Sequence, residues 1–175
     1  MKRAYKYKLK LTVKQKNLLN RIFGCARFIY NWGLSRKKET YEKTKKSLSY
    51  VNLAKELTIL KTQEDTKWLN ECPSVSLQQS LRNLEIAFSS FFKSNNGFPK
   101  FKSKKTAKAV CKFVKANERA IHIDFNEWKI KLPKLGWVKM YKNRDFDLSK
   151  SQFSTVTVYR DKCNDYWCTV LTDDG

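Results

Sequence analysis

The chain has 175 residues, of which 41% are hydrophobic and 14% aromatic, so it can bury a core as one domain or as two small lobes. Lysine and arginine number 37 against 16 aspartate and glutamate, and the formal net charge of +21 exceeds what solubility requires. A polyanion is therefore the expected partner. No apolar run approaches the roughly 18 residues of a spanning helix, and no apolar signal segment follows Met1. We expect a cytoplasmic, nucleoid-associated protein with no membrane partner.

Five cysteines, an odd number, are scattered along the chain. A secreted disulfide framework would be denser, so all five are expected to be reduced. Structural zinc takes four Cys or His ligands at tight spacing. Cys163 and Cys168 are five residues apart and His122 is the only histidine, so no metal ligand is assigned.

The first part of the chain predicts a strand followed by helices. Residues 4–11 alternate between apolar residues and lysines, a period of two that is typical of a half-buried strand. The lysine row has two open interpretations, protection of a sheet edge or a track for phosphates. Thr12 and Gln15 form a capping box for a helix, and Gly24 predicts a break before a second helix from Cys25.

A longer amphipathic helix is predicted from Ser74, because apolar residues recur there at steps of four and three. Its stripe consists of Leu77, Leu81, Leu84, Phe88 and Phe91. Before it, Ser49 is the expected cap of a short helix, and residues 66–69 form a further helical turn. The sequence Asn-Asn-Gly at 95–97 is a turn signal at which the long helix is expected to end.

Residues 98–105 interleave aromatic residues with lysines, and Pro99 excludes a helix there. A nucleic-acid surface needs this combination, because cations replace the counterions of phosphates and flat rings meet bases or sugars. The alternative is a solvated loop. The candidate contacts in this stretch and just after it are Lys100, Phe101, Lys102, Lys104, Lys105, Lys108, Lys112 and Lys115.

From Val110 the pattern changes to a period of two. Strands are expected at 112–114, 120–123, 128–132, 136–140, 154–159 and 166–171, with a hairpin loop at 161–165. Short strands at close spacing suggest a small barrel. Because the first strand cannot bury its apolar face alone, we expect it to pair with this sheet. The predicted class is α+β, a small antiparallel β-barrel with an inserted helical bundle: 1–11 first strand, 12–94 insertion, 95–175 remainder.

Several motifs, in order along nearly the whole chain, carry a resemblance. They are YKYKL at 5–9, GCARFIYNW at 24–32, LQQSLRNL at 77–84, FF at 91–92, GFPKFK at 97–102 and KLPKLGWV at 131–138. Together they closely resemble TnpB, the transposon-encoded RNA-guided nucleases related to type V CRISPR effectors. The resemblance implies that the barrel is a wedge domain and the helices a recognition domain. Guide RNA and duplex DNA carrying a transposon-adjacent motif are the implied partners.

The chain departs from the TnpB pattern at its end. Family members continue into a RuvC-like nuclease domain with three metal-binding acidic residues. Two-metal hydrolysis needs carboxylates that converge so that the metals lie about 4 Å apart. Here Asp145 and Asp147 are expected in a loop, and Asp173 and Asp174 at a fraying end. We assign no catalytic residue, cofactor or enzymatic activity to the chain on its own; Mg²⁺ would belong to a nuclease domain encoded downstream.

The resemblance also implies contacts to the adjacent motif at Tyr50 and Gln78. Glutamine suits bidentate contact with adenine, and tyrosine suits a phosphate or a base edge. Further positions of this kind fall at Ala54, Ser74, Val75, Val114 and Lys115, where the chemistry differs from the best-known relative, so a different motif is expected. Without the resemblance, Gln78 would be interpreted as a solvent-exposed helix residue and Tyr50 as partial core packing.

The function that follows is nucleic-acid binding by the N-terminal portion of a TnpB-like protein. Two alternatives stay open. One is a nuclease-dead, RNA-guided repressor that occupies DNA sites without cutting them. The other is a decayed transposase remnant, for which an exposed apolar patch and aggregation are expected.

Overall fold

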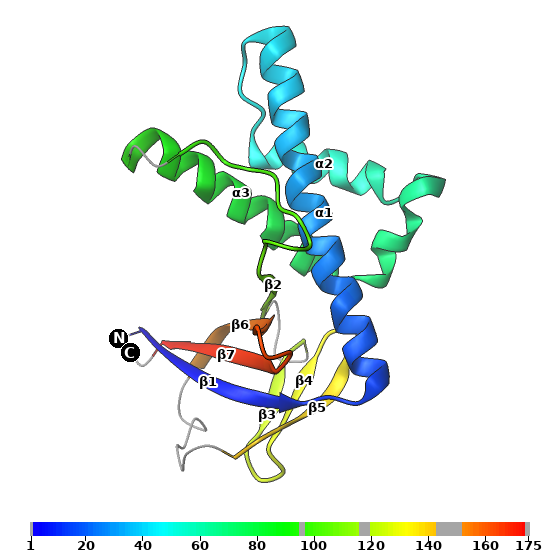
Figure 1. Cartoon of the computed structure of the whole chain (residues 1–175), viewed down its shortest axis with the longest axis vertical. Coiled ribbons are helices and arrows are strands. Elements are labelled where there is room, and N and C mark those ends of the chain that lie inside the picture. Colours follow the sequence, from blue (N-terminus) through cyan, green and yellow to red (C-terminus); the bar gives the residue numbers. More distant parts are fainter. Residues whose placement is uncertain (1, 95–96, 116–119, 143–151, 174–175) are drawn as a thin grey trace. The chain divides into compact units, whose positions relative to one another are not determined.

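A computed structural model describes residues 2–94, 97–115, 120–142 and 152–173, and these form an α+β fold (Figure 1). The helical elements are α1 (Val13–Thr44), α2 (Tyr50–Leu60), the 3-10 helix η1 (Glu64–Glu71) and α3 (Ser74–Ser94). The strands are β1 (Lys2–Lys10), β2 (Ala109–Val114), β3 (His122–Asp124), β4 (Lys129–Leu132), β5 (Gly136–Met140), β6 (Gln152–Arg160) and β7 (Tyr166–Asp173). Two compact units result, residues 1–23 with 108–175, and residues 24–107.

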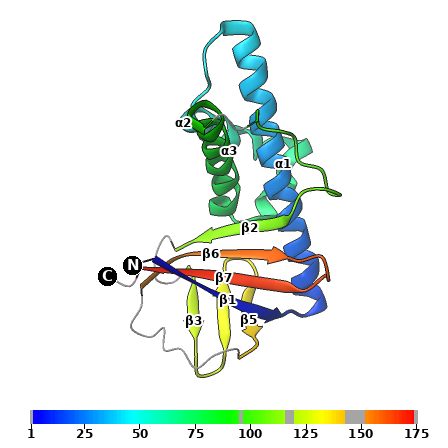
Figure 2. The ribbon, with the colours of Figure 1, turned by 60° about the vertical axis from the view of Figure 1, so that its left-hand side comes forward.

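The first unit contains an antiparallel sheet in the order β2-β6-β7-β1-β5-β4-β3. Strand β1 pairs with β7, where Tyr7 lies opposite Cys168, and with β5, where Leu9 lies opposite Met140. The prediction that the first strand pairs with the later sheet is confirmed, and Figure 2 shows β2, β6, β7 and β1 in that order. In the part of the chain that is described, β2 and β3 remain edges. The sheet is therefore open, and closure into a barrel is not confirmed.

Strict alternation explains how the sheet builds its core. Alternate residues in the central parts of the strands β1, β7, β6 and β2 are buried: Tyr7, Leu9, Cys168, Val170, Val156, Val158, Cys111 and Phe113. Burial in this apolar layer raises the pKa of the Cys168 thiol to about 12. The first turns of α1 add Leu19, Ile22 and Phe23 to the buried set. Phe23 stacks on Tyr166 at a ring-centroid distance of 6.5 Å.

Helix α1 begins at the predicted capping box and continues for 32 residues. The Gln15 backbone N–H donates to Thr12 Oγ1 at 3.2 Å, and Gln15 Oε1 accepts from the Thr12 N–H at 3.1 Å. The predicted break at Gly24 is wrong. A helical glycine costs about 1 kcal/mol, whereas burying one large apolar side chain contributes about 1.5–3 kcal/mol. Buried residues flank Gly24 on both sides, namely Ile22, Phe23, Cys25 and Ala26.

The second unit contains the rest of α1, together with α2, η1 and α3. Three residues of the predicted stripe of α3, Leu77, Leu81 and Leu84, are at most 1% exposed, and the other two, Phe88 and Phe91, are half-buried. A Cβ added to Gly33 on α1 would lie 2.9 Å from Leu81 Cδ2 and 3.0 Å from Leu84 Cδ2. Helix α1 thus approaches α3 so closely that a larger residue at position 33 would have to displace these leucine side chains. Ser49 caps α2 as predicted, since its Oγ accepts from the Asn52 N–H at 3.3 Å.

Cys25 of α1 and Cys72, just before α3, form a disulfide in this unit. The expectation that all five cysteines are reduced is therefore wrong for this pair. The two residues are 47 positions apart, so their spacing gave no signal, and the packing of α1 against α3 brings them together. Cys111 and Cys168 are buried free thiols, and Cys163 is an exposed one.

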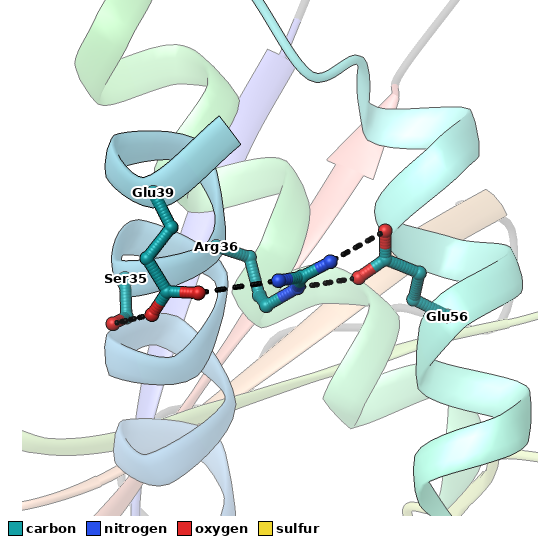
Figure 3. A network of polar contacts seen from close by, with 4 residues as sticks. All are labelled: Ser35, Arg36, Glu39 and Glu56. Atoms are coloured by element: carbon teal, nitrogen blue, oxygen red, sulfur yellow. Dashed lines mark hydrogen bonds and ion pairs between the residues drawn. The ribbon is translucent and has the colours of Figure 1, made fainter. Parts of the chain in front are cut away.

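Polar side chains connect α1 to α2 (Figure 3). The Arg36 guanidinium donates to both carboxylate oxygens of Glu56, at 2.8 and 3.3 Å, and to Glu39 at 3.2 Å. Ser35 Oγ donates to the other oxygen of Glu39 at 2.9 Å. The two-point contact between Arg36 and Glu56 fixes the orientation of both side chains, as paired geometry of this kind does.

Candidate nucleic-acid interface

The basic, aromatic stretch after α3 has no helix or strand from Gly97 through Ser103, and its backbone is attached to α1. Asn31 on α1 makes two hydrogen bonds to one residue of the stretch. Its Nδ2 donates to the Lys102 carbonyl at 2.8 Å, and its Oδ1 accepts from the Lys102 N–H at 2.8 Å. An amide side chain that satisfies both backbone groups replaces the partners a strand would have supplied. The stretch therefore has a defined course without belonging to a sheet.

Lys102, one of the predicted phosphate contacts, lies inward. Its ammonium lies 3.8 Å from the centre of the Tyr30 ring, within the range of a cation–π contact. The side chain is half-buried, and desolvation lowers the pKa of Lys102 below its ordinary value. This geometry suits an anchor between the stretch and α1.

The other predicted residues of the stretch lie at the surface. Lys100, Lys104 and Lys105 are exposed, and the Phe101 side chain is 54% exposed. Phe98 is 42% exposed and packs edge-on against Phe88 and Phe91 of α3. Lys38 of α1 holds its ammonium 5.5 Å from the Phe98 ring and 5.3 Å from the Phe101 ring. We call this set the segment surface: Lys38, Phe98, Lys100, Phe101, Lys104 and Lys105.

A second polar group lies on α3 and includes the predicted motif-reading residues. Ser74, Gln78 and Arg82 are spaced by four residues, which places them along one line of the helix. Ser74 and Gln78 are exposed, and Ser74 Oγ accepts a hydrogen bond from Lys61 Nζ at 2.9 Å. The guanidinium of Arg82 lies 4.8 Å from the centre of the Tyr50 ring, at the start of α2. We call Ser74, Gln78, Arg82 and Tyr50 the α3 row.

Arg82 is not among the candidate contact residues predicted from the sequence. Its four-residue spacing from Gln78 was a usable signal, because residues at that spacing share a helix face. The contact with Tyr50 was not readable, since it joins two different helices.

Three further predicted residues belong to the unit that contains the sheet. Lys108 is exposed and directly precedes β2, and Lys112 is half-buried on β2. Lys115 follows the strand, with its ammonium 4.7 Å from the centre of the Phe153 ring. All three are cationic residues on or beside one edge strand.

The acidic residues considered in the sequence give no assigned site. Asp145, Asp147 and Asp174 lie outside the described residues, and Asp173 ends β7. No group of three or more His, Cys, Asp or Glu that could hold a metal ion occurs among the residues with described positions. Within the same residues, no helix has the length and apolar character needed to cross a bilayer.

Comparison with known proteins identifies the family. The family model described as "Helix-turn-helix domain" (HTH_OrfB_IS605) matches residues 1–46. The chain is 31% identical over 170 residues to "Putative RNA-guided DNA endonuclease InsQ" of Escherichia coli (strain K12), a match that covers 97% of this chain. The chain belongs to the TnpB family. The residues matched by the helix-turn-helix model contain β1 and the uninterrupted α1 in the structure.

Other relatives extend the comparison of this TnpB-family chain. It is 30% identical over 179 residues to "Putative RNA-guided DNA endonuclease" of Streptomyces pristinaespiralis, which covers 99% of this chain. The chain spans 40% and 42% of the lengths of these two endonuclease relatives. It is also 35% identical over 113 residues to "Virulence protein VsdF" of Salmonella dublin, a match that covers 59% of this chain and 95% of that protein.

Proposed function

We propose that this TnpB-family chain binds a guide RNA and duplex DNA that carries a transposon-adjacent motif. The observation that carries the proposal is the segment surface. Three exposed lysines and two partly exposed phenylalanines stand on a backbone that Asn31 attaches to α1. An ordered backbone presents cations and rings at lower entropic cost than a free loop would.

The segment surface and the α3 row suit different parts of recognition. Lysines of the segment surface suit phosphates, which provide affinity without sequence information. Gln78 and Arg82 suit base edges, because glutamine pairs with adenine and arginine with guanine through two hydrogen bonds. Stacking on Tyr50 restricts the guanidinium of Arg82 to few orientations, which favours such two-point contact.

The proposed role of the described residues is nucleic-acid binding. The proposal gives them no part in cutting the DNA strand. Two of the relatives carry the name "Putative RNA-guided DNA endonuclease". A cutting role for this chain would need convergent carboxylates on rigid elements. The wedge-like role of the sheet and the recognition-like role of the helices are part of the same proposal.

A lysine replacement tests the proposal. We expect Lys100→Ala, Lys104→Ala and Lys105→Ala together to weaken binding to transposon-end RNA and to a 20-base-pair duplex by about tenfold or more, because phosphate contacts are lost. Lys102 is kept, since it anchors the stretch. Fluorescence anisotropy at fixed salt measures both affinities.

The control removes the same charge elsewhere. Lys14, Lys16 and Lys55 are exposed helix residues, and their combined replacement by alanine is expected to change binding by less than about threefold. Equal losses in the two triple variants would mean that only net charge matters. Unchanged binding by the first variant would show that the stretch is a solvated loop.

A further inference from the structure

One face of the sheet carries lysines and aromatic rings in two rows. Residues directly paired in an antiparallel sheet point to the same side. Across β1, β7, β6 and β2, the first row is Lys6, Thr169, Thr157 and Lys112, and the second is Lys8, Trp167, Tyr159 and Val110. We call these eight residues the Lys6 face.

The Lys6 face is the side of the sheet opposite the core. The residues that alternate with its members, such as Tyr7, Cys168 and Val158, are buried. Lys6 is exposed, and the other seven members of the Lys6 face are half-buried. Four strands therefore present a polar surface where a doubly covered sheet would present an apolar one.

Contacts within the Lys6 face hold its central ring in place. Trp167 Nε1 donates to Asp161 Oδ2 of the hairpin loop at 2.8 Å, which fixes the indole. The Lys6 ammonium lies 4.1 Å from the centre of the Trp167 ring and 5.6 Å from that of Tyr159. Lys8 pairs with Asp165 of the same loop at 2.7 Å, which raises the pKa of Lys8. Loop carboxylates thus position one ring and one lysine, while the Lys6 charge is shared by two rings.

We propose that the Lys6 face binds an unpaired stretch of a polynucleotide. Trp167 and Tyr159 are cross-strand neighbours, so successive bases can stack on adjacent rings. Lys6 on β1 and Lys112 on β2 are the two ends of the other row. Three strand spacings separate them, about 14 Å at the usual distance between strands, so a cation lies on each side of the stacked bases. The threonines between them are short, so they leave the surface flat. A duplex cannot use this surface in the same way, because its base faces are covered.

The inference rests on the proposed function only in that the chain binds nucleic acid. It adds a second surface, on the sheet unit, and the chemistry of its partner. RNA and DNA strands share that chemistry, and separate arms of the experiment distinguish them.

Binding of three labelled probes tests the proposal: a 12-nucleotide RNA, a DNA of the same sequence, and the corresponding 12-base-pair DNA duplex. We expect Lys6→Glu and Tyr159→Leu each to weaken binding of at least one unpaired probe by about fivefold or more, as loss of a stacking or cation contact implies. Duplex binding is expected to change by less than about threefold. The unpaired probe with the larger loss identifies the preferred strand type.

Lys16→Glu is the matched control, because it makes the same charge change at an exposed residue of α1. It is expected to leave preference among the probes unchanged. If Lys6→Glu and Tyr159→Leu change only the melting temperature, or weaken duplex and unpaired probes equally, the Lys6 face is structural and the inference is wrong. Melting curves confirm that each variant is folded.

Crosslinking gives a second measurement that does not depend on substitution. Ultraviolet irradiation of the complex with 4-thiouridine RNA, followed by mass spectrometry, is expected to label the peptide that contains Tyr159 or Trp167. Labels confined to residues 24–107 would overturn the inference and leave the proposed function intact. Binding that survives the combined replacement of Lys100, Lys104 and Lys105 but is lost in Lys6→Glu would overturn the role of the segment surface in the proposed function and leave the inference about the Lys6 face intact.

Discussion

Gly33 shows how much a single residue decides in the helical unit. An added Cβ would lie 2.9 and 3.0 Å from two leucine methyl carbons of α3, Leu81 Cδ2 and Leu84 Cδ2, which are fully packed. We expect Gly33→Ala to lower the free energy of unfolding by up to about 2 kcal/mol, because displacing the packed leucines costs about 1–3 kcal/mol and the better helix propensity of alanine returns about 0.5–1 kcal/mol. Urea denaturation followed by circular dichroism measures the change.

Gly24 offers the matched control on the same helix. A Cβ added there would meet nothing within 4 Å. Gly24→Ala is therefore expected to raise the free energy of unfolding by about 0.5–1 kcal/mol, since alanine favours helix over glycine. Two substitutions with the same chemistry should have opposite signs, and a shared sign would contradict the close approach of α1 to α3.

Lys102 illustrates a residue whose type was readable and whose role was not. The stretch around it contains several lysines, and nothing in the sequence distinguishes one from another as a phosphate contact. Lys102 differs from the others in two contacts: its backbone donates one hydrogen bond to Asn31 and accepts another from it, and its ammonium lies over the ring of Tyr30. Sequence alone could not make this distinction, because Asn31 lies 71 residues away.

At the scale of elements, the Cys25–Cys72 disulfide connects α1 to the start of α3. A crosslink that closes a loop of this length restricts the unfolded chain, and its loss costs about 2–4 kcal/mol. We expect dithiothreitol to lower the unfolding midpoint of the wild-type chain in urea accordingly. The double variant Cys25→Ala and Cys72→Ala should have the lower midpoint with or without the reductant.

Cys163→Ala is the control for this experiment, because Cys163 is an exposed free thiol. It should retain the response of the wild type to dithiothreitol. A wild-type midpoint that the reductant does not change would exclude a contribution of this disulfide to stability.

At the scale of the whole molecule, a net charge of +21 makes binding depend on salt. If about six phosphates are neutralised, the logarithm of the association constant should fall with the logarithm of salt concentration at a slope of about −4 to −5. Titrations of the 20-base-pair duplex between 50 and 300 mM KCl (about a sixfold range) measure this slope. A flat response would contradict binding through phosphates.

Local patterns determined much of this protein. The capping box at Thr12 and Gln15, the cap at Ser49 and the buried stripe of α3 were readable because each depends on residues within a few positions of one another. The period of two likewise indicated the strands, and the motifs along the chain indicated the family, which the comparisons bear out.

Only the tertiary structure decided the features that join distant residues. Pairing of Cys25 with Cys72, the inward position of Lys102 and the rows of the Lys6 face each bring together residues far apart in sequence. The open order of the sheet and the continuity of α1 through Gly24 also depend on packing. The physical reason is that spacing along a chain specifies which side of an element a residue occupies, whereas the identity of its neighbour depends on strand register and on how closely helices approach.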